Sequence, residues 1–303
     1  MKKLLTKFFA LLLALCLLTG AALAETADTS ATTDTTATTE TSETAETTET
    51  ADEAVVTEPL ATAHKAVDVV LDGDLSEWNL NDPLVLDGGV GIPLDNGTTW
   101  YPQLVRDYHF WNGPDDLSAK IYIAWDETYF YIGADVTEDS IFGAIETLPL
   151  DGVDNFQLYL STNPADDPER TVYASNDFKV FLILDGEYWD NAFDRSMVPK
   201  ENRKRFISKG MDGGESVLDG YEVAAQQSAT GFIYEAKIPW ACFSNRDIAV
   251  YTPVVGDTVN FNFLITDISY PCPGTEYIPQ MAWTGTAAMD TDPSQWGRLT
   301  FAE

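Results

Sequence analysis

Apolar and polar side chains alternate with a period of two in seven short runs between residues 120 and 266. The runs are Lys120 to Trp125, Tyr129 to Val136, Asn155 to Leu160, Phe178 to Leu184, Tyr221 to Gln226, Phe232 to Ile238 and Thr258 to Thr266. Such alternation is typical of β-strands that bury one face. No stretch from His64 to Glu303 keeps a helical stripe beyond about two or three turns. The pattern predicts an all-β fold, an antiparallel β-sandwich of the jelly-roll kind.

The first 24 residues have the three parts of an export signal. Lysines at positions 2, 3 and 7 precede an apolar run through Leu18, and residues 22–24 form an A-x-A cleavage site. We therefore expect residues 1–24 to be a signal peptide and the protein to be secreted or extracellular, with association to the cell envelope left open. No later stretch reaches the roughly 18 apolar residues of a spanning helix, so no transmembrane segment is expected in the mature chain.

Residues 25–63 are dominated by Thr, Ala and Glu. A segment of this composition has too few apolar side chains to bury a core. We expect it to be a disordered linker, followed by one ordered domain over residues 64–303.

The chain has 49 acidic and 17 basic residues, a formal net charge of −32. Nucleic acid and anionic lipid are poor partners for such a chain, because their binding needs clustered Lys and Arg. Zinc has few ligands here, since the histidines are His64 and His109 and no CxxC pair occurs. Cys242 and Cys272 could form a disulfide or could be separate core residues.

Two long stretches do not fit compact hairpins: residues 87–117, rich in Gly, Pro, Asn and aromatic residues, and residues 188–220, rich in Lys and Arg. Long loops inside a compact domain are usually functional or disordered, and the aromatic density favours order for the first. Between Leu184 and Glu187, Asp185-Gly186 is the strongest short hairpin signal in the chain.

Six motifs follow one another in the order found in a known family. They are L-D-G-D-L-S-E-W at 71–78, I-A-W-D-E-T-Y-F-Y-I at 123–132, D-G-V-D-N-F-Q-L-Y-L at 151–160, Y-E-A-K-I-P-W at 234–240, V-N-F-N-F-L-I-T-D at 259–267 and D-P-S-Q-W-G-R-L at 292–299. In this order the chain resembles the family 9 carbohydrate-binding modules. The resemblance implies a β-sandwich with bound calcium that grips sugars without cleaving them and accompanies xylanases and related plant-cell-wall enzymes.

The family's best-known sugar grip is a pair of tryptophans that sandwich a terminal sugar ring. The equivalent positions fall at Asp151 and near Asp290, and neither is aromatic. The resemblance also places Gln157 at a family carboxylate position and Lys179 at a family arginine position. We therefore expect the fold to be retained and the tryptophan clamp to be absent.

Sugar recognition needs flat aromatic faces together with polar groups that bind hydroxyls. We hypothesise that the aromatic-rich stretch at 87–117, here called the aromatic loop, binds sugar in place of the tryptophan clamp. The alternative is that its rings cover a sheet face. The expected ligand-binding residues are Trp100, Tyr101, Tyr108, Trp111, Gln157, Lys179, Trp189 and Trp283.

Three acidic clusters on expected loops could supply the oxygen ligands of a structural calcium ion. None has EF-hand spacing, so the expectation rests partly on the family resemblance. The expected metal ligands are Asp72, Asp74 and Glu77, then Glu138 and Asp139, then Asp151 and Asp154.

Catalysis is a weaker hypothesis, because acidic pairs are so abundant that they discriminate nothing and only His109 could serve a Ser or Cys nucleophile. A haem site would need an axial pair that no spacing indicates. We predict a secreted, non-catalytic domain that recognises plant-cell-wall polysaccharide or oligosaccharide ends of the xylan or cellulose type, with separate wall-degrading enzymes as partners. The alternative is a calcium-braced structural or adhesion domain of the envelope that has lost sugar binding.

Overall fold

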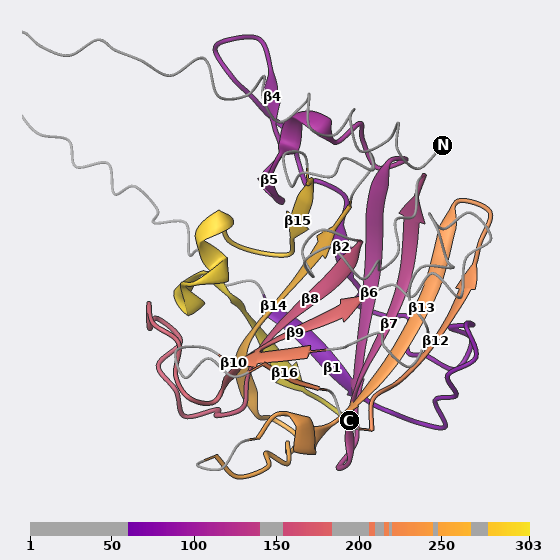
Figure 1. Cartoon of the computed structure of the whole chain (residues 1–303), viewed down its shortest axis with the longest axis vertical. Helices are drawn as coiled ribbons and strands as arrows, with labels where there is room; N and C mark the ends of the chain where they lie inside the picture. The colour runs from indigo at the N-terminus through magenta and orange to yellow at the C-terminus, as the bar shows by residue number, and fades with distance from the viewer. Residues whose placement is uncertain are drawn as a thin grey trace, which may run out of the picture. The chain divides into compact units, whose positions relative to one another are not determined.

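The computed structural model describes residues 60–139, 154–183, 206–209, 215–217, 220–244, 248–267 and 278–303. Regular structure in this part of the chain consists of β-strands and short 3₁₀ helices, which confirms the all-β prediction (Figure 1). The expected signal peptide, all of the expected linker except its last four residues, the Asp185-Gly186 turn, Trp189, Asp151 and Cys272 lie outside the described residues. No helix among the described residues is long and apolar enough to cross a membrane.

The first sheet has the strand order β11-β10-β9-β8-β14-β16-β1, and β15 and β5 extend it beyond β14. Its strands are β1 (Leu60–Lys65), β5 (Leu104–Arg106), β8 (Asn155–Ser161), β9 (Asp177–Ile183), β10 (Phe206–Lys209), β11 (Glu215–Val217), β14 (Thr258–Thr266), β15 (Gln280–Ala282) and β16 (Gly297–Phe301).

The second sheet has the order β1-β6-β7-β13-β12, with β2 beside β6. Its strands besides β1 are β2 (Leu84–Leu86), β6 (Leu117–Trp125), β7 (Tyr129–Glu138), β12 (Glu222–Gln227) and β13 (Gly231–Pro239). β6 and β7, which contain the predicted strands at 120–125 and 129–136, form a hairpin in register from Leu117↔Glu138 to Trp125↔Phe130. A separate two-stranded hairpin joins β3 (Ile92–Pro93) to β4 (Thr99–Trp100).

β1 belongs to both sheets. Its first four residues pair with β16, from Leu60↔Arg298 to Ala63↔Phe301, and its last two pair with β6. Both pairings are parallel, whereas the other pairings among the described strands are antiparallel, so the predicted antiparallel β-sandwich is confirmed and β1 adds two parallel pairings to it. The strand also begins at Leu60, four residues before the expected start of the ordered domain. Alternation did not reveal it, because its small alanines carry little hydrophobic contrast.

The core lies between the two sheets and is rich in aromatic residues. Phe156 of β8 lies 5.0 Å from Tyr234 and 6.2 Å from Phe232, both on β13, measured between ring centroids. Phe130 of β7 lies 6.4 Å from Phe261 of β14. Burial of these rings is the largest favourable term in holding the two sheets face to face.

Both expected long loops contain regular structure. The first holds β3, β4, β5 and the 3₁₀ helix η1 (Tyr108–Phe110), and the second includes β10 and β11. These strands have four residues or fewer, too few to show a period of two. The described part of the chain also contains the 3₁₀ helices η5 (Trp240–Cys242), η6 (Ala287–Asp290) and η7 (Pro293–Gln295). Cys242 is half-buried against the core.

Candidate functional site

The outer face of the first sheet carries polar side chains that are nevertheless buried. Along β8 the core-facing residues Phe156, Leu158 and Leu160 alternate with outward-facing Asn155, Gln157, Tyr159 and Ser161. On β14 the outward-facing polar residues are Asn260, Asn262 and Thr266. A buried polar group must be hydrogen-bonded to be tolerated, so this face is a built polar network.

Gln157 lies at the centre of this network. Its Nε2 donates to Asn155 Oδ1 at 3.1 Å and to Thr266 Oγ1 at 3.4 Å. Gln280 of β15 donates to the same Thr266 hydroxyl at 3.2 Å. The network therefore crosses from β8 over β14 to β15.

We call the line of side chains from Gln280 and Thr266 through Gln157 and Tyr159 to Asp290 and Lys179 the polar row. Its end at Lys179 and Asp290 reaches solvent. Lys179 on β9 forms an ion pair with Asp290, which ends η6, and the Tyr159 hydroxyl lies 2.7 Å from the same carboxylate and 2.9 Å from Gln157 Oε1. A phenol has one proton, and it goes to the charged acceptor, which binds it more strongly. The Asp290 side chain is 51% exposed, so a ligand can reach this pair from solvent.

Charge and burial fix the protonation of this group. Burial opposes ionisation of Asp290, but the charge of Lys179 and hydrogen bonds from Lys179 and Tyr159 outweigh it, so the pKa of Asp290 lies below its ordinary value. Burial, with the charge of Asp290, raises the pKa of Tyr159 well above its ordinary value. At neutral pH the row presents an ionised carboxylate, an ammonium and a neutral phenol.

The segment after β15 holds Asp290 in place. Thr286 caps η6, and Asp292 caps η7 by accepting from the backbone N–H of Ser294 at 3.1 Å. Trp296 donates its indole N–H to the Met289 carbonyl at 2.8 Å, and both side chains pack with Tyr159 in a small cluster on the outer face. Caps and packing together set the position of the carboxylate.

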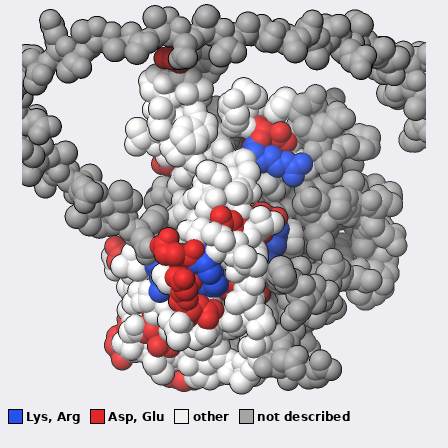
Figure 2. Space-filling model, turned by 90° about the vertical axis from the view of Figure 1, so that its left-hand side faces the viewer, with Lys and Arg blue, Asp and Glu red and all other residues white. Residues whose placement is uncertain are grey.

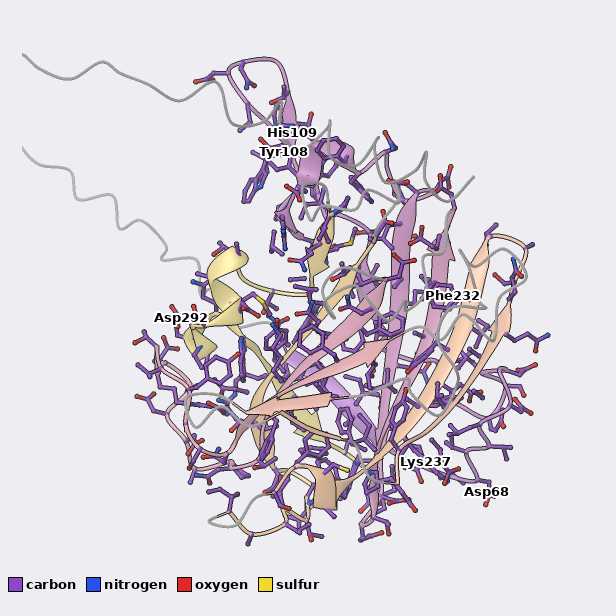
Figure 3. The ribbon with its side chains drawn as sticks, in the orientation of Figure 1. Asp68, Tyr108, His109, Phe232, Lys237 and Asp292 are labelled. Atoms are coloured by element: carbon purple, nitrogen blue, oxygen red, sulfur yellow. The ribbon has the colours of Figure 1, made fainter. Side chains whose placement is uncertain are left out.

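The aromatic loop reaches the edge of the first sheet that β15 forms. β5 pairs with β15 at Arg106↔Gln280, and Asp107 accepts from the backbone N–H of Ile278 at 2.7 Å. Asp107 has a φ of 47°, and the chain turns there into η1. The half-buried ring of Tyr108 and the exposed ring of His109 lie 3.8 Å apart, both labelled in Figure 3.

The other aromatic residues of that loop differ in their surroundings. Trp111 is buried in the core, donates its indole N–H to the Leu117 carbonyl at 2.9 Å, and packs against Gly88. Tyr101 meets Trp111 edge to face at 4.8 Å and packs against the core. Trp100 is half-buried on β4. Tyr108 is also partly buried against the core, but its ring contacts exposed His109 after β5, so we carry Tyr108 into the proposed site and leave Trp111 and Tyr101 out.

Trp283 follows β15 and is half-buried, with its ring 6.0 Å from that of Phe261. Because it packs against the core between the sheets, we do not carry Trp283 into the site either. Figure 2 shows the side of the molecule that lies on the left in Figure 1, where acidic and basic side chains lie close together among uncharged described residues.

The first acidic cluster has its own role in the fold. Asp72 Oδ1 accepts from the N–H of Asp74 at 3.0 Å, and Asp74 Oδ1 accepts from the N–H of Ser76 at 2.8 Å. Glu77 accepts from the Ser76 hydroxyl at 3.1 Å. These carboxylates close the turns of their own segment, and calcium binding by this cluster stays a prediction.

The second cluster gains a partner that the sequence did not indicate. Asp139 lies near Asp116, and burial followed by the charge of Asp116 raises the pKa of Asp139. Glu138 and Asp154 are buried. Among the described residues, no group of three or more His, Cys, Asp or Glu side chains is arranged to hold a metal ion.

Several members of the polar row were absent from the expected site: Tyr159, Thr266, Gln280 and Asp290 as a ligand-facing carboxylate. The alternation on β8 and β14 could have found the first two, since they share the outward phase of Gln157. Gln280 and Asp290 come from the C-terminal quarter of the chain, and nothing in the local sequence pairs them with β8.

Comparison with known proteins agrees with this architecture. The family described as "Carbohydrate family 9 binding domain-like" matches residues 98–303. Among solved structures, the chain is similar to a family 9 carbohydrate-binding module from Caldicellulosiruptor kristjanssonii in complex with cellotriose, at 13% identity and a TM-score of 0.50, over 80% of this chain and 94% of that chain. The same comparison found the module in complex with glucose, at 15% identity and a TM-score of 0.49, over 80% and 95%.

No curated protein matches the chain. Identity this low shows a shared fold alone, whereas the family match spans most of the domain and both sheets. The chain therefore belongs to the carbohydrate family 9 binding domain-like family, whose modules bind carbohydrate without catalysing a reaction.

Proposed function

We propose that this protein is an exported module that binds neutral plant-cell-wall polysaccharide, or its oligosaccharide ends, of the xylan or cellulose type. The acidic Thr-rich segment at 25–63 would present the domain to its substrate. Separate wall-degrading enzymes would act on the same polymer. The solved relative with cellotriose supports the ligand class, since cellotriose is a fragment of such a chain.

The observation that carries the proposal is the outer polar row that leads from Lys179 and Asp290 to Tyr108 and His109. A sugar hydroxyl both donates and accepts, so it can bridge an ammonium and a carboxylate that already face each other. Gln157 is 3% exposed and lies beneath the surface, where its Nε2 donates to Asn155 and Thr266 and fixes the amide beside Tyr159. The ring of Tyr108 adds an aromatic surface at the edge of the same sheet.

The proposal needs no calcium at the sugar. The carboxylates of the first cluster are committed to their own turns, and Asp151 of the third lies outside the described residues. We retain calcium as a structural ion to be tested, with the loop around Asp116 and Asp139 as the place to look.

The chain offers a matched pair of lysines for the test. Lys179 pairs with Asp290 and lies over the rings of Tyr159 and Phe181; Lys237, on the second sheet, pairs with Glu222 and lies over Tyr129. Their side chains are 19% and 23% exposed. Lys237 is labelled in Figure 3.

We expect Lys179→Ala to weaken binding to xylo- and cello-oligosaccharides about tenfold, the loss of a charge-assisted hydrogen bond, while Lys237→Ala binds as the native protein does. Binding is measured by calorimetry and by pull-down on insoluble xylan and cellulose. Equal affinities in both variants would place the sugar elsewhere. Failure of the native protein to bind any of these glycans would favour the envelope structural or adhesion domain instead.

A further inference from the structure

A cavity of about 450 Å³ lies on the outer face of the second sheet, away from the polar row of the first. Its floor includes His64 and Ala124, which pair side by side on β1 and β6, and its walls include Val67, Val69, Glu77 and Trp78. Because Ala63 and Ile123 are buried in the core, their neighbours His64 and Ala124 face outward, towards the cavity. The volume falls within the range of about 300–1,000 Å³ typical of small-molecule sites.

The wall of the cavity is rigid. Trp78 donates its indole N–H to Glu235 at 2.8 Å and packs over Gly133, where a Cβ would lie only 3.1 Å from the ring. Trp78 also meets Tyr131 edge to face at 6.5 Å. A preformed wall lowers the entropy cost of ligand binding.

His64 has an unsatisfied nitrogen beside this space. Its Nε2 is buried and has no hydrogen-bond partner among the described residues. A buried polar atom without a partner costs about 1–3 kcal/mol, and rotation of the imidazole towards the cavity would let a ligand hydroxyl recover it. A hydroxyl suits either tautomer of the imidazole, since it can donate or accept.

The remaining lining indicates what kind of ligand fits. Glu77, Asn79 and Glu303 supply acceptors at the rim. Val67 is 67% exposed at the mouth and offers apolar surface beside Trp78 and Val69. The ammonium of Lys65 lies 2.5 Å from Glu127 and over Trp125, so its charge is already matched. Hydroxyl-binding groups next to apolar surface are the chemistry that recognises a neutral sugar ring.

We infer that this cavity is a second sugar site, which takes one or two neutral sugar units and is independent of the polar row. The ligand class rests on the proposed function, whereas the position of the site does not. Two sites on opposite faces would let one domain engage two chains of a polysaccharide, or two points on its surface, and gain avidity.

The two histidines of the chain make the inference testable by NMR. His64 reports on the cavity, and exposed His109 reports on the edge of the polar row. Imidazole spectra of the full-length protein are recorded during titration with glucose, xylose and cellobiose, and with ethanolamine as a non-sugar probe. We expect the sugars to shift the His64 signals in the native protein and equally in Lys179→Ala.

Two variants test whether the sugar binds inside the cavity. Ala124→Leu fills the floor and should weaken the His64 response about tenfold. Val67→Ser changes an exposed residue and should weaken the response by a smaller factor; Val90→Ser, on a different loop and more exposed still, is its control. Melting temperatures verify that each variant is folded.

Sugar-induced shifts at His109 alone would overturn the cavity site and leave the proposed function standing. Shifts at His64 alone would support the cavity and count against the polar row. Shifts at neither would overturn both. A response of His64 to ethanolamine and not to sugars would overturn the assignment of the ligand class. An undiminished response in Ala124→Leu would overturn the placement of the sugar in the cavity.

Discussion

The outer face of each sheet buries a polar side chain, Glu235 on the second sheet and Gln157 on the first. Glu235 is enclosed by its hydrogen-bond donors, whereas Gln157 belongs to a network that reaches solvent. On the second sheet, Glu235 is fully buried and accepts from the N–H groups of Asp72 and Gly73 and from the Trp78 indole at 2.6–2.9 Å. On the first sheet, Gln157 and Tyr159 lead outward to a half-exposed Asp290. The first arrangement locks the fold, and the second leaves an ion pair within reach of a ligand.

This difference explains why two of the family motifs are needed together. L-D-G-D-L-S-E-W supplies the three donors and Y-E-A-K-I-P-W supplies the carboxylate that accepts them. A motif that recurs in a binding family can therefore describe the scaffold and say little about the ligand.

The comparison predicts its largest effect at Glu235. Glu235→Ala leaves three buried donors without an acceptor and should lower the free energy of unfolding by about 3 kcal/mol or more. Glu222→Ala, which removes an exposed ion-pair partner on the neighbouring strand, should cost less than about 1 kcal/mol. Urea unfolding of both variants measures the difference, and similar losses would mean that Glu235 is not a lock.

The next effect is at Gly73, which has a φ of 87° and whose Cβ, if present, would lie 2.7 Å from Gln226 Cβ. Gly73→Ala should cost about 1–3 kcal/mol through backbone strain and this clash. Gly97 has a φ of 83°, and a Cβ added there would meet nothing within 4 Å, so Gly97→Ala carries only the strain. A larger loss at Gly97 would contradict the close approach of the turn to β12.

Removing a tyrosine hydroxyl from each sheet distinguishes an effect on sugar binding from an effect on stability. Tyr159 donates to Asp290 on the first sheet, and Tyr131 donates to Asp126 on the second, both at 2.7 Å. Each Tyr→Phe change should cost about 1 kcal/mol of unfolding free energy. Only Tyr159→Phe should also weaken sugar binding by calorimetry; a loss in both would make the effect structural.

The two carboxylates should respond to pH with opposite signs. Burial raises the pKa of Glu235 despite the hydrogen bonds from Trp78, Gly73 and Asp72 that oppose it, so its contribution to stability is present at low pH and is lost as pH rises through the folded pKa. The lowered pKa of Asp290 makes its contribution present above the ordinary value of about 3.9 and lost as pH falls.

Relative to the native protein, Asp290→Asn should therefore become more destabilising as pH rises up to the ordinary Asp value of about 3.9, and Glu235→Gln less destabilising as pH rises above the ordinary Glu value of about 4.3. Urea unfolding across this range measures both slopes. Parallel slopes would show that one of the two environments has been assigned wrongly.

The smallest expected effect concerns calcium. If the loop around Asp116 and Asp139 holds the ion, EGTA should lower the melting temperature, because an ion that binds only the folded state stabilises it. Asp139→Asn should reduce this response, and Asp95→Asn, on an exposed loop, should not. An EGTA-treated protein that melts like the calcium-loaded one would remove calcium from the account of this chain.

Much of the fold could be predicted from the chain itself. Strands with long, regular alternation, such as β6, β7 and β14, were found because a half-buried strand of nine or ten residues has a clear period. β5 and β15 were missed because they have three residues each, and β1 because its small alanines give little hydrophobic contrast.

The site was less predictable, for the same reason. Gln157 and Lys179 came from the family resemblance, but their partner Asp290 lies more than a hundred residues from either. Glu235 looked like an ordinary outward-facing residue of an alternating strand. Its burial depends on a turn that arrives from more than 150 residues earlier in the chain.

The dual membership of β1 has a mechanical consequence. Tension from the segment that precedes Leu60 acts along the strand, where four residues pair with β16 and the next two with β6. Such a pull loads these hydrogen bonds in shear, so they resist together rather than opening one after another. A domain held on a tether while gripping a solid substrate would thus transmit force into both sheets at once.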